Sequence, residues 1–243
     1  MRTSLHTIVA AALVLLGGSW AQAQSAADGH WTGTVQVPGV TLPVEFDLAR
    51  NADGAVIGTF GQPAQKLRGL PLSNVVVDGN GVSFTIPLTG TTFRGTVDAN
   101  RTALSGEFSS STLGKVPILL TRAGDPRFDP PPTSAAVGKE LEGAWSGRLE
   151  ADGGLRLRLK MSNQPNGTAV GSLVSVDQGG LDMPIAVAQK GSSVTIDVPM
   201  IASTYAGELN AAGTEIVGTF TTPQTAALPL TFRRAAPDDA KKD

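Results

Sequence analysis

The feature of this sequence that most constrains its fold is an internal repeat. The stretch "GHWTGTVQ" at residues 29–36 returns as "GAWSGRLE" at residues 143–150, and further landmark residues recur at nearly constant spacing. The matched pairs are Trp31 with Trp145, Gly58 with Gly171, Pro71 with Pro184, Phe93 with Tyr205, Gly106 with Gly218, Pro117 with Pro229 and Arg122 with Arg234. A period of about 113 residues is too long for one solenoid unit, so each copy is expected to be a complete domain.

The repeat also sets the expected domain boundaries. The two copies cover residues 28–123 and 140–235, and the segment between them, residues 124–139, is rich in proline and small residues. Such a composition favours an extended linker. A charged tail, residues 236–243, follows the second copy.

The N-terminus has the pattern of a signal peptide. Residues 1–23 contain one basic residue, a short apolar run and the small-residue site Ala21-Gln22-Ala23. The apolar run is too short for a membrane anchor. We therefore expect cleavage after Ala23 and a periplasmic or extracellular protein. The chain has no cysteine, so burial and hydrogen bonds, rather than disulfides, must stabilise it.

Within each copy, apolar and polar residues alternate with the period of a β-strand. The stretches "PVEFDL", "VSFTIP", "LRLRLKM" and "VTIDVPM" alternate in this way, and turn clusters such as "NADG" and "QPNG" separate them. Several strands place a glycine two positions after a bulky residue, as in Phe93-x-Gly95, which permits strong coiling. The sequence therefore predicts an all-β protein of two tandem, small, antiparallel up-and-down barrels with eight strands each and little room inside.

The ends of each copy predict a structural plug. Arg122 and Arg234 share strand parity with the inward apolar residues of the last strand of each copy. In an up-and-down barrel the end of the last strand lies beside the start of the first strand, where Trp31 and Trp145 are found. An inward arginine on an inward tryptophan would close one mouth, with a cation–π contribution of roughly 0.5–2 kcal/mol.

The Gly-x-Trp opening and the closing arginine resemble the signature of the calycin group, which includes the lipocalins. The second copy, with "GSLVSVDQGGLDMPI", "YAGEL", "IVGTF" and "LPLTFRR", is also similar to the β-rich accessory domain that precedes the catalytic domain in some bacterial secreted α/β-hydrolases. This resemblance covers nearly all of residues 143–235, and its most specific part is Ser175-x-Asp177-Gln178-Gly179. Both resemblances imply small calycin-like barrels. No hydrolase domain follows, so the resemblance implies no catalytic activity.

Groups that could carry catalysis are few. His30 is the single histidine after the expected cleavage site, and any Ser-His-Asp chemistry would depend on it. Asp98 and Asn100 echo a calcium loop, but the glycine and glutamate that such a loop needs are absent, so a hairpin turn is the better interpretation. We expect no metal and no cofactor. The alternative is a hydrolase-associated or weakly hydrolytic enzyme that uses Asp177 with Asp182 or Asp197.

Binding is the favoured function, and the proposed contact residues are Ser175, Asp177, Gln178 and Gly179, with Gln65 at the matching place in the first copy. Stabilisation of a turn by side-chain hydrogen bonds is the competing interpretation of this cluster. A basic strand face at residues 156–160 is expected to be a solvated outer face.

These features favour an exported, non-enzymatic binding or accessory protein of the cell envelope. Its partner would be another protein or a small ligand, held at barrel-mouth loops, and we expect a monomer. The formal net charge of −2 gives no reason to expect nucleic acid. An outer-membrane barrel would need aromatic girdles, and only 5% of the residues are aromatic, so we expect a protein that does not span the membrane.

Overall fold

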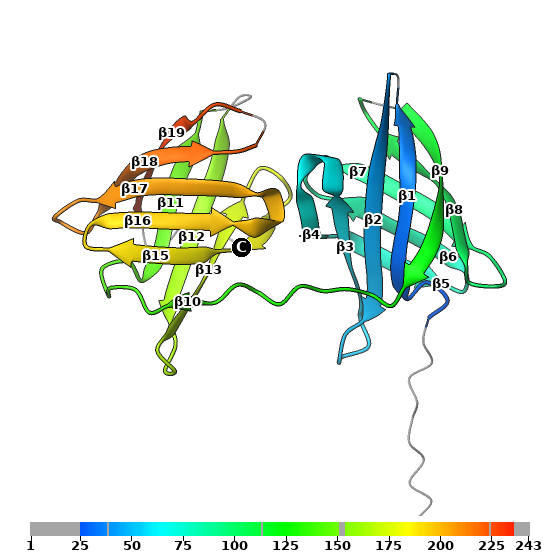
Figure 1. Ribbon diagram of the computed structural model, residues 1–243, viewed down its shortest axis with the longest axis horizontal. Coiled ribbons are helices and arrows are strands. Elements are labelled where there is room, and N and C mark those ends of the chain that lie inside the picture. The colour runs from blue at the N-terminus through cyan, green and yellow to red at the C-terminus, as the bar shows by residue number, and fades with distance from the viewer. Residues whose placement is uncertain (1–24, 38, 113, 151–153, 224, 236–243) are drawn as a thin grey trace, which may run out of the picture.

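The computed structural model describes residues 25–37, 39–112, 114–150, 154–223 and 225–235 (Figure 1). Most of these residues lie in β-strands joined by tight turns, and the strands form two sheets, one for each copy of the repeat. Each sheet curls into a nearly closed barrel. The prediction of two tandem antiparallel β-barrels is therefore confirmed.

The first sheet contains nine strands, all antiparallel to their neighbours. They are β1 (Gly29–Val37), β2 (Val40–Arg50), β3 (Val56–Gln62), β4 (Leu67–Pro71), β5 (Ser73–Asp78), β6 (Gly81–Ile86), β7 (Thr91–Val97), β8 (Ala103–Ser110) and β9 (Gly114–Gly124). A single 3-10 turn, η1 (Pro63–Gln65), joins β3 to β4. The strand order is β4-β3-β2-β1-β9-β8-β7-β6-β5, so β1 pairs with β9 and the ladder opens between β4 and β5.

The second sheet follows the same plan with one additional strand. Its strands are β10 (Ser134–Ala135), β11 (Gly143–Leu149), β12 (Leu155–Asn163), β13 (Thr168–Ser175), β14 (Leu181–Pro184), β15 (Ala186–Lys190), β16 (Ser193–Val198), β17 (Ser203–Leu209), β18 (Glu215–Thr221) and β19 (Leu228–Arg234). The 3-10 turn η2 (Pro199–Ile201) joins β16 to β17. β11 pairs with β19, as β1 pairs with β9, and β14 pairs with β13 beside β10.

Two details differ from the expected eight strands per barrel. In both barrels the stretch after the third strand of the repeat forms two strands, β4 and β5 in the first barrel and β14 and β15 in the second; in the first barrel Gly69 and Asn74 there adopt positive φ angles of 64° and 51°. In the second barrel, β10 lies inside the segment expected to be linker, and it pairs with β13. The end of that segment therefore belongs to the second barrel, because its backbone completes a sheet edge.

Inward glycines make room for the largest interior rings. A Cβ atom added at Gly95 or Gly106 would lie 2.6 or 2.5 Å from Cζ of Phe93, and one added at Gly207 would lie 2.7 Å from the hydroxyl of Tyr205. Such distances are far below van der Waals contact, so these positions require glycine. These inward glycines therefore leave space for a neighbouring side chain.

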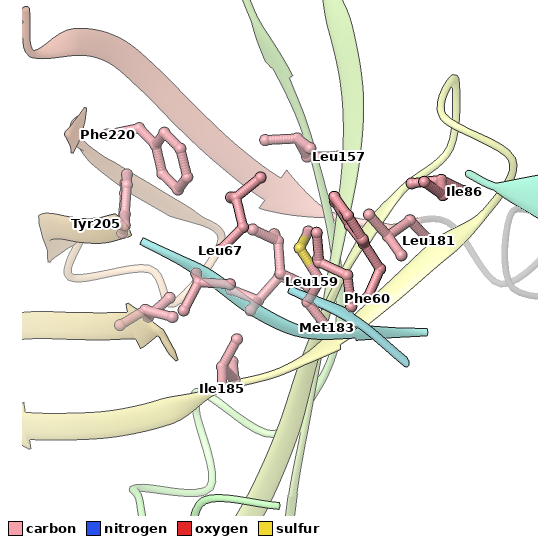
Figure 2. Close-up of a cluster of buried hydrophobic side chains, with 14 of the residues drawn as sticks. Phe60, Leu67, Ile86, Leu157, Leu159, Leu181, Met183, Ile185, Tyr205 and Phe220 are labelled. Carbon is pink, nitrogen blue, oxygen red and sulfur yellow. The ribbon is translucent and has the colours of Figure 1, made fainter. Parts of the chain in front are cut away.

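The buried apolar side chains of both barrels belong to one cluster. Phe60, Leu67 and Ile86 of the first barrel and residues such as Leu181 and Met183 of the second are members of it (Figure 2). The strands of the two sheets do not interleave. The barrels are thus separate in topology, but they pack against each other through apolar side chains.

Candidate functional site: the open mouth of the first barrel

One end of each barrel is closed by a tryptophan and an arginine. Trp31 is fully buried and is the register partner of Arg122, and Trp145 is fully buried and is the register partner of Arg234. The indole Nε1 of Trp31 donates to the carbonyl oxygen of Ala27 at 2.8 Å. This is the arrangement that the parity of the last strand predicts.

The plug is tighter in the second barrel. The guanidinium carbon of Arg234 lies 4.2 Å from the ring centroid of Trp145, whereas that of Arg122 lies 6.0 Å from the ring of Trp31. Arg234 also donates to the carbonyl oxygens of Glu140, Glu142 and Gly213. These bonds tie the last strand to the segment that enters the barrel.

The glycine of each Gly-x-Trp motif leaves space for the arginine side chain at the same end of the barrel. A Cβ atom at Gly29 would lie 2.8 Å from Nε of Arg122, and one at Gly143 would lie 3.2 Å from Nη1 of Arg234. Gly143 also has a φ of 103°, which side chains rarely adopt. The first residue of the motif is therefore glycine because the arginine passes over it.

His30 lies at this closed end, and its contacts give it a structural role. It is 4% exposed, and its Nδ1 lies 2.9 Å from Oδ1 of Asp47. The same carboxylate oxygen accepts a hydrogen bond of 2.7 Å from the backbone N–H of Arg127, in the linker. The buried pair thus holds the start of the linker against the first barrel, and neither of these two hydrogen bonds involves a hydroxyl nucleophile.

The opposite end of the first barrel is open and hollow. A cavity of about 150 Å³ lies there, lined mainly by apolar side chains from nearly every strand. Its lining residues are Val35, Val37, Leu42, Val44, Phe60, Gln62, Gln65, Leu67, Ile86, Leu88, Thr89, Thr91, Phe108, Ser110, Gly114 and Val116. The interior of the first barrel is therefore not completely filled by its own side chains.

The size of two inward residues explains where the cavity lies. Val35 and Val44 face the mouth of the first barrel, and the repeat places Leu149 and Leu157 at the matching positions of the second. A valine is one methylene shorter than a leucine, so the two valines leave space near the opening. All four side chains are at least nine-tenths buried.

Polar groups stand at the rim of this cavity. Gln62, which precedes η1, and Gln65, its last residue, lie on one side, and Thr89, Thr91 and Ser110 lie on the others. Amide and hydroxyl groups around an apolar hollow can orient a ligand that carries one polar end. Gln65, predicted from the sequence as a binding residue, is thus part of the mouth.

The second predicted cluster forms a hydrogen-bonded turn. Ser175 is buried, and its hydroxyl donates to Oε1 of Gln178 at 2.7 Å. Asp177 accepts hydrogen bonds from the backbone N–H of Arg156 at 2.8 Å and from its Nε at 2.9 Å. The side-chain hydrogen bonds from Arg156 are the main cause that holds the pKa of Asp177 below its usual value. Turn stabilisation, the competing interpretation of this cluster, therefore matches these contacts.

This turn also touches the rim of the cavity in the other barrel. Nε2 of Gln178 donates to the carbonyl oxygen of Leu88 at 3.5 Å, and Gly179 lies against Pro87. Leu88 lines the cavity. The structure thus brings Gln178 and Gly179 to the loop that borders the same mouth as Gln65, although the two clusters are far apart in the sequence.

The three carboxylates that a hydrolytic enzyme would use lie in different surroundings. Asp177 is paired with Arg156, and Asp197 accepts a hydrogen bond from the hydroxyl of Thr204. Asp182 lines a different hollow of about 570 Å³ between the barrels and the linker. None of these contacts joins one of the three carboxylates to another, whereas acid–base catalysis by a pair of carboxylates needs two of them at one site.

The remaining polar motifs also have local partners. Asp98 accepts hydrogen bonds from the backbone N–H groups of Thr102 and Ala103, at 2.7 and 2.9 Å, which is the predicted hairpin turn. In the basic strand face at residues 156–160, Arg156 forms an ion pair with Asp177. In the described part of the chain no three histidine, cysteine or acidic residues gather into a possible metal site.

The cavity was not predicted from the sequence. The signal that could have indicated it is the pair of valines in the first copy where the second copy has leucines. A comparison of inward residue volumes between the two copies would have located the less filled barrel. The contact between Gln178 and Leu88 had no such signal, because it depends on how the barrels pack.

Comparison with known proteins leaves the family open. No family model and no curated protein matches the chain. The solved structures that match this chain include the following three. One is a candidate outer membrane protein of Bacteroides fragilis NCTC 9343, with 13% identity, coverage of 86% of this chain and 98% of that one, and a TM-score of 0.28.

The second is a protein of unknown function from the DUF3598 family of Nostoc punctiforme PCC 73102, with 12% identity, coverage of 86% and 97%, and a TM-score of 0.28. The third is the isotype 1 transferrin binding protein B of serogroup B Neisseria meningitidis, with 10% identity, coverage of 80% and 66%, and a TM-score of 0.25. TM-scores this low carry no conclusion about function. No helix in the described residues is long and apolar enough to cross a bilayer.

Proposed function

We propose that this chain is an exported, non-enzymatic binding protein of the cell envelope, whose first barrel holds a small apolar group at its open mouth. The observation that carries the proposal is the apolar cavity of about 150 Å³ opposite the Trp31–Arg122 plug. Concave sites lined mainly by apolar side chains, with a few polar groups that orient the ligand, are the usual binding sites for small molecules.

The size of the cavity limits the ligand. Sites for drug-sized molecules have volumes of roughly 300–1,000 Å³, so this mouth accepts one ring or a short alkyl chain rather than a large ligand. The remainder of a longer molecule would lie at the rim, where Gln62 and Gln65 can bond a polar end. Burial of a few methylene groups contributes about 0.8 kcal/mol each, which favours weak, chain-length-dependent binding.

The proposal is tested by calorimetric and NMR titration of the mature protein with benzene and with a series of linear alcohols of increasing length. We expect affinity to rise with chain length and then to level off once the cavity is full. The double variant Val35→Leu/Val44→Leu, which copies the residues of the second barrel, should weaken binding at least tenfold. Val217→Leu, on the exposed outer face of β18, is the matched control and should bind as the parent does.

Two results would contradict the proposal. Equal binding by the cavity-filling variant and its control would place the ligand elsewhere. Hydrolytic turnover by the purified protein that disappears in an Asp177→Ala/Gln178→Ala variant would favour the enzyme alternative.

A further inference from the structure

The two barrels differ at the gap where each sheet fails to close. In the second barrel, β10 lies in this gap between β13 and β15. Ser134 and Ala135 pair with Ala169 and Thr168 of β13, and the hydroxyl of Ser134 accepts a hydrogen bond of 2.7 Å from the backbone N–H of Val187 on β15. A two-residue strand from outside the repeat thus joins both edges.

Further bonds fix the residues after β10. The backbone N–H of Val137 donates to Oδ1 of Asn163 at 2.9 Å, and that of Gly138 donates to Oε1 of Gln189 at 2.7 Å. Val137 itself is 8% exposed and belongs to the apolar core. The segment therefore acts as a wedge that has small residues at the edge and one apolar side chain pointing inward.

The matching gap of the first barrel has no such strand among the described residues. Val56 of β3 occupies the position in the first copy that matches Ala169 in the second copy. Its only strand partner is on β2. Ala169 is 2% exposed and Val187 is 7% exposed, whereas Val56, Val75 and Val77 at the open gap are only partly buried. The edge of β3 and the edge of β5 thus face each other without a strand between them.

The backbone of β3 presents hydrogen-bonding groups to this gap. Alternate residues of a strand direct their N–H and C=O groups to opposite sides. The carbonyl oxygen of Ala55 accepts a bond from the N–H of Asn51 on the β2 side, so Val56 directs its N–H and C=O toward the gap. In the second barrel the matching residue, Ala169, is paired with β10. An open strand edge of this kind readily accepts another chain.

We propose that the first barrel binds an extended segment of a partner polypeptide, which adds as an antiparallel strand to the β3 edge at Val56 and fills the gap before β5. The chemistry of the occupant follows from the segment that fills the same gap in the second barrel. It is a short run of small residues with a hydroxyl side chain at its start and one apolar side chain that points into the barrel, as in Ser134-Ala135-Ala136-Val137.

The expected removal of the signal peptide explains why the strand that fills this gap would come from another polypeptide. Trp31 bonds the carbonyl of Ala27 and Trp145 bonds that of Leu141, four residues earlier in both copies. Counted back from these anchors, the counterparts of residues 135–137 are Ala21, Gln22 and Ala23. Cleavage after Ala23 removes them, and the mature chain then has no segment of its own at that position of the repeat.

The test uses the mature chain, residues 24–243, and a fluorescent peptide with the sequence of residues 132–139, which is the protein's own wedge. We expect saturable binding by fluorescence anisotropy and slowed hydrogen exchange at the Val56 amide in the presence of the peptide. Val56→Pro removes the N–H that faces the gap and should weaken binding at least tenfold. Ile57→Thr, which changes the neighbouring outward side chain but keeps the edge N–H of Val56, is the matched control.

A tethered variant tests the same edge without a substitution in β3. Fusion of the sequence of residues 133–138 directly before Ser25 should fill the gap from within and abolish peptide binding. The hydrogen-exchange measurement on the unaltered protein remains decisive if Val56→Pro fails to fold.

Three results would overturn the proposal. Absence of peptide binding, or binding unchanged in both the Val56→Pro and the tethered variant, would show that the edge is not a docking site. A Val56 amide already protected in the monomer without peptide would show that the chain's own N-terminal residues fill the gap. A dimer in sedimentation that Val56→Pro dissociates would assign the edge to a second copy.

Discussion

The first barrel is packed around a cluster of phenylalanines, whereas the second is packed mainly with aliphatic side chains and one tyrosine. Phe46 lies with its ring centroid 5.0 Å from that of Phe84 and 5.3 Å from that of Phe60. In the second barrel the main aromatic contact is an edge-on pair, Tyr205 with Phe232, at 5.2 Å. The two copies thus share a frame of strands and glycines while their interiors differ.

The two barrels also differ outside their cores. The second barrel has the closer arginine plug and an extra strand in its gap, and the first has the looser plug, the open gap and the cavity. The added strand and the closer plug are thus in one copy, and the open gap and the mouth cavity are in the other. This comparison indicates that the second barrel is the more complete scaffold and that the first retains the surfaces on which a ligand or partner can bind.

The largest expected effect tests whether the two cores are independent. Phe46→Ala should lower the free energy of unfolding of the first barrel by about 3–5 kcal/mol, because it leaves a cavity amid the phenylalanine cluster. Leu159→Ala is the matching change in the second barrel. Denaturation followed by Trp31 fluorescence in a Trp145→Phe background, and the reverse, measures each barrel alone. Equal losses in both barrels from either change would mean that the protein unfolds as one unit.

The next effect compares the two plugs. Arg234→Ala should destabilise the second barrel by roughly 1–3 kcal/mol, because it removes the cap on Trp145 and the bonds to the entering segment. Arg122→Ala should cost less, since its guanidinium lies at the limit of cation–π distance. The midpoints of urea denaturation for the two variants provide the measurement. A larger loss for Arg122→Ala would contradict the ranking of the plugs.

A smaller effect concerns the strand that closes the second barrel. Ser134→Ala leaves the N–H of Val187 without its acceptor, at a cost of about 1 kcal/mol, the low end of the usual range because the bond is only part-buried. Limited proteolysis reports the same change. Cleavage of the parent protein should stay between Gly124 and Thr133, and in the variant it should extend toward Lys139. Cleavage after Ser134 in the parent would show that β10 is not held.

The smallest effect is the pH dependence of the turn that touches the first barrel. The pKa of Asp177 lies below its usual value, so the contribution of its pair with Arg156 is present at neutral pH and is lost as the pH falls through that lowered pKa. We expect the Arg156 Nε resonance to shift only at a pH below the ordinary pKa of an aspartate, and to be independent of pH in Asp177→Asn. A shift of that resonance near neutral pH would contradict the pairing.

Much of the strand arrangement was predictable from local sequence patterns. Strand alternation, turn clusters and the repeat predicted two antiparallel barrels, because side-chain period and turn chemistry are encoded residue by residue. The positions of Arg122 and Arg234 beside the tryptophans followed from strand parity alone. The strand count did not follow, because β10 comes from the segment between the two copies and pairs with a strand of the second copy.

The candidate site was only partly predictable. Gln65, and the cluster Ser175, Asp177, Gln178 and Gly179, were identified as distinctive polar residues, and their role as ligand contacts stays a prediction. What the sequence did not indicate is that Gln178 lies beside the loop that borders the mouth lined by Gln65. This proximity depends on the bond from Gln178 to Leu88, which joins residues of different barrels.

By itself the sequence determined the repeat, the period of the strands, the inward glycines and the tryptophan–arginine ends. Each of these depends on residues that are close along the chain or that share one strand face. The tertiary structure alone decided where volume is left unfilled and which edge is left unpaired. A cavity depends on the combined volume of side chains from many strands, and a free edge depends on whether a distant segment reaches it, so neither can be derived from any single stretch of residues.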